Sequence, residues 1–158
     1  MTRRRSANDP TEPAEPASET TTGQPLTDRN YRALARFRHA LRVFERFSEE
    51  KARAAGLTPA QHQLLLAIRG HHTPDRPPSL SELADVLQVR LHSAGELVNR
   101  AEANGLVTRQ VDPTDHRRAL LSLTHHGAQQ LVALSVVHRE ELRRFHGQMT
   151  DLLRQLDD

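Results

Sequence analysis

The sequence predicts a mainly α-helical (α+β) fold, a winged helix-turn-helix placed between long helices from the two ends of the chain. Within residues 78–123, two short amphipathic segments are followed by two stretches of strand character that flank a charged turn. Apolar residues also recur every three or four positions over residues 26–55 and again after Thr124, a spacing typical of long helices. We therefore expect a helical region of residues 26–57 and 124–158, and a winged lobe of residues 58–123.

The first long helix is expected over residues 26–55, capped by Thr27 or Asp28 and ended by Gly56. Its stripe consists of apolar side chains at helical spacing: Leu34, Phe37, Leu41, Phe44 and Phe47. This helix is too long for the core that one subunit offers, which favours a homodimer. Residues 1–25 are dominated by small, polar and acidic residues, and we expect a disordered tail there.

Two shorter helices follow, and each begins at a recognisable cap. Thr58 and Gln61 form a capping box, the pattern in which two side chains satisfy the free N–H groups of a helix start. The next helix is capped by Ser79, which pairs with Glu82, or by Ser81. These caps predict where the first half of a helix-turn-helix begins.

The second half of the motif is expected over residues 90–104. Val89, in the turn before it, is predicted to point inward, and Gly105 stands where a left-handed cap is needed. The buried stripe of this helix comprises residues at helical spacing: Ala94, Leu97, Val98 and Ala101. The remaining side chains of the helix should face outward or sideways.

The wing is expected as strands over residues 106–111 and 119–123, joined by a charged tip of residues 112–118. Arginines on an exposed tip favour insertion into a narrow, electronegative minor groove of DNA, and Arg117 is assigned to that position. Asp115 lies two residues earlier and is placed to orient the guanidinium. The tip therefore predicts a DNA contact.

After the wing, Thr124 is expected to cap a long helix that Gly147 breaks. A separate short helix should then carry the last apolar residues: Met149, Leu152, Leu153 and Leu156. This leucine-rich segment suits packing against the first helix of a second chain.

Four runs, SELADVLQV, NGLV, DPTDHRR and LSLTHHG, closely resemble the MarR family of bacterial transcriptional regulators, over about residues 27–156. The resemblance implies a cytoplasmic homodimer whose terminal helices interlock and whose winged lobes bind an inverted repeat in double-stranded DNA. Repression by promoter occlusion is the expected outcome. The resemblance also implies a possible small-molecule effector, phenolic or anionic aromatic. Its pocket, where the dimer helices meet the lobe, would draw on Phe37, Arg38, Leu41 and Leu64.

The residues expected to contact DNA fall into three groups. Candidates for contact with bases are Leu91, His92, Ser93, Gly95, Glu96 and Asn99. Candidates for contact with phosphates are Arg90, Arg100, Arg109 and Arg118, and Arg117 with Asp115 completes the wing.

Two positions depart from the family pattern. Arg90 replaces the usual serine, and Gly95 with Glu96 replaces a basic or polar reader. Glu96 is open to three interpretations: it accepts from cytosine N4, it repels phosphate, or it pairs with Arg100.

Composition excludes several classes of function. The chain of 158 residues has no cysteine, which excludes disulfides and thiol sensing, and its formal net charge is only +2. It shows no phosphate-binding glycine loop, zinc-hydrolase pair or nucleophile elbow, so we expect neither an enzyme nor a bound cofactor. No apolar run is long enough to span a membrane.

The ten histidines do not form helical pairs at metal-binding spacing, so no metal site is predicted. His39, His62 and His138 lie on different expected helices, and their convergence would make a metal-responsive regulator the alternative. A second alternative is a winged-helix protein-interaction module that never binds DNA. Loss of Arg117 and Arg118 would distinguish this module from a DNA-binding regulator, because only a DNA-binding wing needs these charges.

Overall fold

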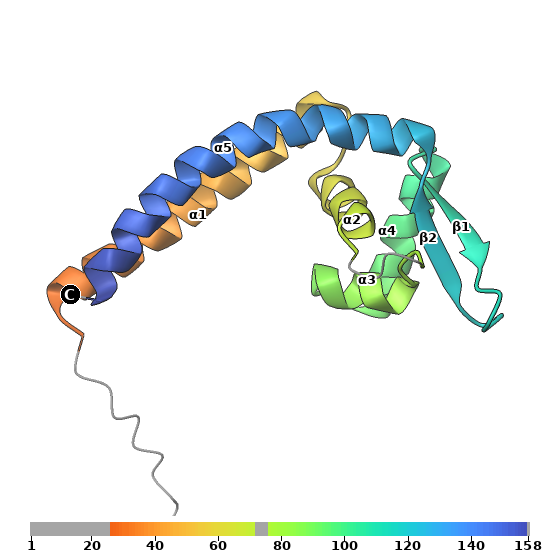
Figure 1. Cartoon of the computed structure of the whole chain (residues 1–158), viewed down its shortest axis with the longest axis horizontal. Coiled ribbons are helices and arrows are strands. Elements are labelled where there is room, and N and C mark those ends of the chain that lie inside the picture. The colour runs from red at the N-terminus through yellow and green to blue at the C-terminus, as the bar shows by residue number, and fades with distance from the viewer. Residues whose placement is uncertain (1–25, 72–75, 158) are drawn as a thin grey trace, which may run out of the picture.

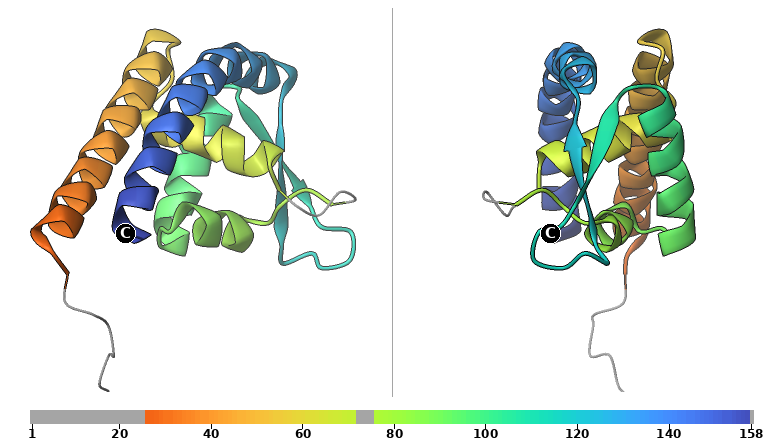
Figure 2. Two further views of the ribbon diagram at one scale, coloured as in Figure 1. Left: turned by 60° about the vertical axis from the view of Figure 1, so that its left-hand side comes forward. Right: turned by 90° about the vertical axis from the view of Figure 1, so that its right-hand side faces the viewer.

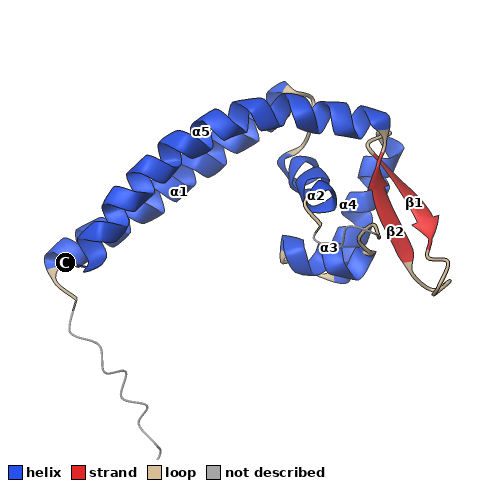
Figure 3. Cartoon of the chain, viewed as in Figure 1, coloured by secondary structure: helices blue, strands red, loops and turns tan. Residues whose placement is uncertain are grey.

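The computed structural model describes residues 26–71 and 76–157, and the predicted tail of residues 1–25 lies outside this part. The elements are α1 (Asp28–Ala54), α2 (Pro59–Arg69), α3 (Leu80–Leu87), α4 (Leu91–Ala103), β1 (Val107–Val111), β2 (Ala119–Leu123) and α5 (His125–Asp157). Figure 3 shows the two strands as one small sheet beside the helices. The predicted class, mainly helical with a winged helix-turn-helix, is confirmed.

The two terminal helices lie side by side and run in opposite directions, which forms what we call the helical arm (Figure 1). Phe44 of α1 meets Phe145 of α5 with ring centroids 5.1 Å apart, and Phe47 meets His138 at 5.9 Å. The far end of the arm extends beyond the lobe that α2, α3, α4 and the hairpin form. None of the helices in the described ranges has the length and apolar character of a membrane span.

The expected break at Gly147 is wrong, because α5 continues through it from His125 to Asp157. A glycine inside a helix costs only about 1 kcal/mol relative to alanine. Both flanks of Gly147 pack in the arm: Phe145 lies against Phe44, and Met149 and Leu152 are buried. This packing outweighs the local preference of one glycine.

The lobe has one apolar core, to which every one of its elements contributes. Its fully buried members include Leu64, Leu65, Leu83, Val98, Leu106 and Leu121. The hairpin is antiparallel, with Val107 opposite Leu123 and Val111 opposite Ala119. Figure 2 shows that the strands extend away from the core to a free tip.

Local signals set most of the helix ends. Capping boxes start α1 at Thr27, α2 at Thr58 and α3 at Ser79, each with its partner three residues later. The inward position predicted for Val89 is wrong, because this side chain is 41% exposed. Gln88 adopts the left-handed conformation (φ 54°), and the turned chain lets Val89 N–H cap the carbonyl of Ala84 while its side chain stays outside.

Candidate nucleic-acid interface

The helix α4 divides into an inner face and an outer face at the period that the sequence predicts. Ala94, Leu97, Val98 and Ala101 are buried. The exposed residues are Arg90, Leu91, His92, Ser93, Glu96, Asn99 and Arg100. Gly95 is half-buried, and a Cβ at this position would lie 3.8 Å from Leu80. The outer face is therefore continuous and available to a groove of DNA.

The start of α4 has no side-chain cap. Arg90 occupies the cap position, makes no capping hydrogen bond, and no acidic residue lies in the first turn. The first N–H groups of the helix and the guanidinium therefore place positive charge at the same end, as suits a phosphate contact.

Glu96 pairs with His92 one turn earlier, with His92 Nε2 lying 3.4 Å from Glu96 Oε1. Both side chains are more than half exposed, so this contact is weak and is charged only when His92 is protonated. Arg100 is not the partner that the structure gives to Glu96.

Asn99 and Arg109 bind each other across the gap between α4 and β1. Arg109 Nη2 donates to Asn99 Oδ1, and Arg109 Nε lies 3.5 Å from Glu102 Oε2. A candidate base reader and a candidate phosphate contact therefore form one unit, in which Asn99 fixes the direction of the guanidinium.

Two aspartates shape the wing tip. Asp112 is 2% exposed, and its Oδ1 accepts from Thr114 N–H at 2.8 Å and from Thr114 Oγ1 at 2.7 Å. These bonds lower the pKa of Asp112. Asp115 Oδ1 accepts from the backbone N–H of Arg117 at 3.0 Å, so this carboxylate orders the turn, and the Arg117 side chain remains exposed.

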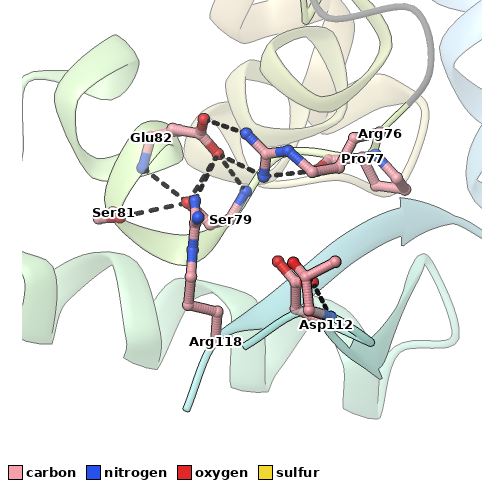
Figure 4. A network of polar contacts seen from close by, with 8 residues as sticks. Arg76, Pro77, Ser79, Ser81, Glu82, Asp112 and Arg118 are labelled. Carbon is pink, nitrogen blue, oxygen red and sulfur yellow. Dashed lines mark hydrogen bonds and ion pairs between the residues drawn. The ribbon is translucent and has the colours of Figure 1, made fainter. Parts of the chain in front are cut away.

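A polar network joins the wing to the start of α3 (Figure 4). Glu82 accepts from Arg76 Nη2 at 2.5 Å and from Arg76 Nη1 at 3.2 Å, and its Oε2 also accepts from Ser79 N–H at 2.7 Å. Arg118 Nη2 of the wing lies 3.7 Å from the same Oε2. The hydrogen bonds from Arg76, and then from Ser79, lower the pKa of Glu82 to about 2, so its carboxylate stays charged. We name Arg76, Ser79, Glu82 and Arg118 the Glu82 network.

The residues assigned to an effector pocket differ in burial and lie on different elements. Leu64 is fully buried in the lobe core, Phe37 and Leu41 are half-buried on α1, and Arg38 is exposed. A cavity of about 350 Å³ lies where α1, α2 and α5 meet. Its lining includes Phe44, Ser48, His62, Leu66, His138, Arg139 and Leu142.

Two of the three histidines considered for metal binding converge beside this cavity. The rings of His62 and His138 lie 4.6 Å apart, and both side chains are buried, whereas His39 is exposed on α1. His138 Nδ1 donates to the Leu134 carbonyl at 2.8 Å, which leaves Nε2 to accept from Ser48 Oγ at 2.8 Å in the neutral ring. Within the described residues, no group of three or more His, Cys, Asp or Glu side chains is arranged to hold a metal ion.

Burial, and then the electrostatic interaction with the neighbouring His138, lower the pKa of His62 to about 4. Its Nε2 atom is buried and has no hydrogen-bond partner among the described residues. The sequence could name these histidines as candidates but not decide which of them meet, because their meeting depends on how α2 packs against the arm.

Comparison with known proteins shows that the lobe is similar to one family. Residues 55–118 match the model of the MarR family. A protein named as a transcriptional regulator for the hcr operon in Thauera aromatica is 29% identical over 116 residues, which covers 72% of this chain and 66% of the relative. The chain thus spans slightly less than two thirds of that relative's length.

Solved structures share the fold. AbsC, a MarR family transcriptional regulator from Streptomyces coelicolor, matches with a TM-score of 0.66 and 24% identity, over 78% of this chain and 82% of AbsC. The MepR–DNA complex from S. aureus matches with a TM-score of 0.62 and 22% identity, over 73% of this chain and 82% of MepR.

Proposed function

The chain belongs to the MarR family, and from this premise we propose that it is a transcriptional regulator that binds double-stranded DNA as a homodimer. The observation that carries the proposal is the pairing, on one lobe, of the exposed polar face of α4 with an exposed arginine at the wing tip. MepR, which shares this fold, has been solved in complex with DNA.

In this proposal α4 enters the major groove and the wing tip enters the adjacent minor groove. Arg117 reads the width and potential of the minor groove, while Arg90, Arg100, Arg109 and Arg118 contact phosphates. The exposed positions Leu91, His92, Ser93 and Glu96 lie at or near base edges, together with half-buried Gly95, and Asn99 beside them holds Arg109. With a formal net charge of +2, affinity depends on where these arginines lie and little on bulk charge.

The arm supports the homodimer. Large apolar side chains remain exposed on both of its helices, among them Tyr31 (59%), Leu34 (37%), Val132 (65%) and Leu153 (49%). Such an exposed apolar surface on one chain is suited to packing against the same surface of a second copy of the arm. Two lobes held this way would place their α4 helices about 34–36 Å apart, which matches half-sites of an inverted repeat one helical turn apart.

The cavity between the arm and the lobe supports an effector site. It combines apolar walls from Phe44, Leu66 and Leu142 with the exposed Arg139. An anionic aromatic molecule of small size would match these groups and would change how the arm and the lobe pack. Repression by occlusion of a promoter, relieved by this ligand, is the regulatory outcome that we propose.

The decisive experiment is DNA binding across a salt series. We would titrate three proteins, the wild type, Arg117→Ala and Arg42→Ala, with labelled DNA from upstream of the protein's own gene and with an unrelated duplex. Arg42→Ala is the matched control, because it removes the same charge from the exposed face of the arm. We expect tight, salt-sensitive binding to the upstream DNA that Arg117→Ala weakens and Arg42→Ala leaves unchanged.

Two outcomes would contradict this expectation. Equal, weak binding to both duplexes would place the operator elsewhere in the genome. No binding to any duplex at low salt would contradict the DNA proposal and favour a winged-helix interaction module, in which loss of Arg117 should be tolerated.

A further inference from the structure

The Glu82 network connects the wing to the helix-turn-helix through one carboxylate. Arg76 binds Glu82 through both of its terminal nitrogens, and Ser79 adds a backbone bond and a hydroxyl bond of 2.6 Å. Arg118 supplies the wing's contact, at 3.7 Å from Oε2. Figure 4 shows Arg76 and Arg118 approaching the carboxylate from different sides.

Backbone contacts bring the same two parts together. Leu121 N–H of β2 donates to the Pro78 carbonyl at 2.8 Å, and Ser79 forms a bridge with Leu120. These bonds fix the middle of β2 against the start of α3. The tip beyond Ala119 has no such backbone support from α3 in the described residues, so the side chain of Arg118 is what extends the attachment toward the tip.

The members of the network are held to different degrees. Glu82 is fixed by four hydrogen bonds from Arg76 and Ser79, whereas Arg118 makes an ion pair without a hydrogen bond. The Arg118 side chain remains 40% exposed, and its guanidinium carries five N–H donors, more than a single carboxylate oxygen can engage. Arg118 is therefore oriented by Glu82 and still available to a phosphate.

We propose that Glu82 is a positioning residue for DNA binding, which holds Arg118 and the wing tip at the correct angle to α4 without touching DNA itself. The inference rests on the proposed function. It adds the residue that sets the angle between the two DNA-contacting parts of the lobe, the wing and α4. Asp112 completes the charge balance, because its carboxylate interacts electrostatically with Arg76 and with Arg118. Two arginines and two carboxylates therefore leave this junction neutral, and its role is orientation.

A purely electrostatic role and a positioning role of Glu82 predict opposite changes in DNA affinity for one substitution. Glu82→Gln removes a negative charge close to DNA, and charge alone would then strengthen binding to every duplex. A lost positioning residue instead weakens binding to the operator. Glutamine also serves at the third helical position of a capping box, so α3 should keep its start.

The probes are a duplex that the wild-type protein has selected from a random pool and a scrambled duplex of the same composition. We expect Glu82→Gln to weaken binding to the selected duplex about tenfold, the effect of one lost charge-assisted contact, with the salt slope reduced by about one. The double variant Glu82→Gln/Arg118→Ala should differ from Arg118→Ala by no more than about twofold, because both changes remove the same contact. Asp85→Asn is the matched control, with the same charge change on an exposed side chain of α3.

A measurement on the free protein separates the failure of this inference from the failure of the DNA proposal. Hydrogen exchange should show faster exchange of the tip amides, including Arg118 N–H, in Glu82→Gln but not in Asp85→Asn, with α3 amides unchanged. Unchanged tip exchange, stronger binding by Glu82→Gln, or fully additive effects in the double variant would each overturn the positioning role. Failure of the wild type to select any duplex would instead overturn the proposed function, and the DNA-binding part of this inference with it.

Discussion

Asn99 shows how a residue on a proposed DNA-binding surface can already be hydrogen-bonded to a neighbouring side chain. An asparagine that reads adenine uses both its carbonyl oxygen and its amide nitrogen. The carbonyl oxygen of Asn99 already accepts from Arg109 Nη2, and Arg109 also lies beside Glu102. The side chain of Asn99 is therefore better placed to direct the Arg109 guanidinium toward a phosphate than to specify a base.

We expect Asn99→Ala to weaken binding to operator variants by a uniform factor of about three to ten, the effect of one hydrogen bond. Release of Arg109 removes a phosphate contact that every sequence shares, so base preference should survive. Arg109→Gln should give the same uniform loss. The measurement is a titration of the protein against operators changed at one base pair at a time. Loss of preference at one base pair would identify Asn99 as a base reader instead.

The outer face of α4 could be predicted from the sequence because helical periodicity alone decides which of its side chains are buried. The residues that these side chains contact could not be predicted from the sequence. Asn99 meets Arg109 because β1 returns beside α4, and Arg118 meets Glu82 because β2 passes the start of α3. The sequence predicts Glu82 as half of a capping box, but its contact with Arg118 depends on a residue far along the chain.

At the scale of elements, α5 tests how far packing overrides local preference. Gly127 and Gly147 both lie in this helix. A Cβ on Gly127 would lie 2.0 Å from the Leu106 carbonyl oxygen, whereas a Cβ on Gly147 would meet nothing within 4 Å. The first glycine allows α5 to start against the wing, and the second has no such role in one chain.

These two glycines should therefore respond to alanine in opposite directions. Gly147→Ala should raise the free energy of unfolding by about 0.5–1 kcal/mol, because alanine loses less backbone entropy in a helix. Gly127→Ala should lower it by at least about 1–3 kcal/mol, the cost of overpacking against a fixed carbonyl. Urea denaturation followed by circular dichroism measures both. A destabilised Gly147→Ala variant would show that another chain approaches α5 closely at this position.

The contact between α2 and the arm contains the buried histidine pair. His62 on α2 lies 4.6 Å from His138 on α5, and the pKa of His62 is lowered to about 4. The unfolded chain takes up a proton at the ordinary value of 6.5, so between these limits the unfolded state binds more protons than the folded state. The contribution of the neutral His62 side chain to the free energy of unfolding is fully present above pH 6.5 and is lost as the pH falls toward 4.

We expect the free energy of unfolding to decrease on acidification by up to about 1.4 kcal/mol per pH unit from His62. His62→Leu should reduce this slope. Its cost at neutral pH should be small, because the buried Nε2 has no partner to lose among the described residues. Urea denaturation between pH 4.5 and 7.5 measures the slope, with exposed His39→Gln as the control. An unchanged slope in His62→Leu would contradict the assignment.

Helix starts could be predicted because a cap is a local signal, carried by pairs such as Thr58 with Gln61. The continuity of α5 through Gly147 could not, because it depends on Phe44 and other residues of α1 that lie opposite. The inward position predicted for Val89 is wrong for a related reason, since the left-handed turn at Gln88 decides the direction of the Val89 side chain. The convergence of His62 with His138 likewise requires the packed structure.

At the scale of the whole molecule, the arm carries more apolar surface than one chain covers. Large side chains of α1 and α5 remain exposed away from the lobe, including Tyr31, Leu34 and Leu153. The proposed binding to an inverted repeat would need two lobes at a fixed separation, and the arm is the part of the described chain that projects beyond the lobe (Figure 1). Dimerisation and DNA binding should therefore fail together when the arm is altered.

We expect Leu34→Glu, and independently Leu153→Glu, to convert a dimer of two 17.8 kDa chains into monomers, because each places a charge in the shared apolar surface. Operator affinity should then fall on the order of 10²-fold, since the second lobe no longer binds as part of one molecule. Val86→Glu is the control for the oligomeric state alone, because Val86 is 62% exposed on α3, outside the arm. Sedimentation equilibrium and operator titration measure the two effects. Variants that remain dimeric would place the interface elsewhere, and variants that become monomeric with full operator affinity would separate dimerisation from DNA recognition.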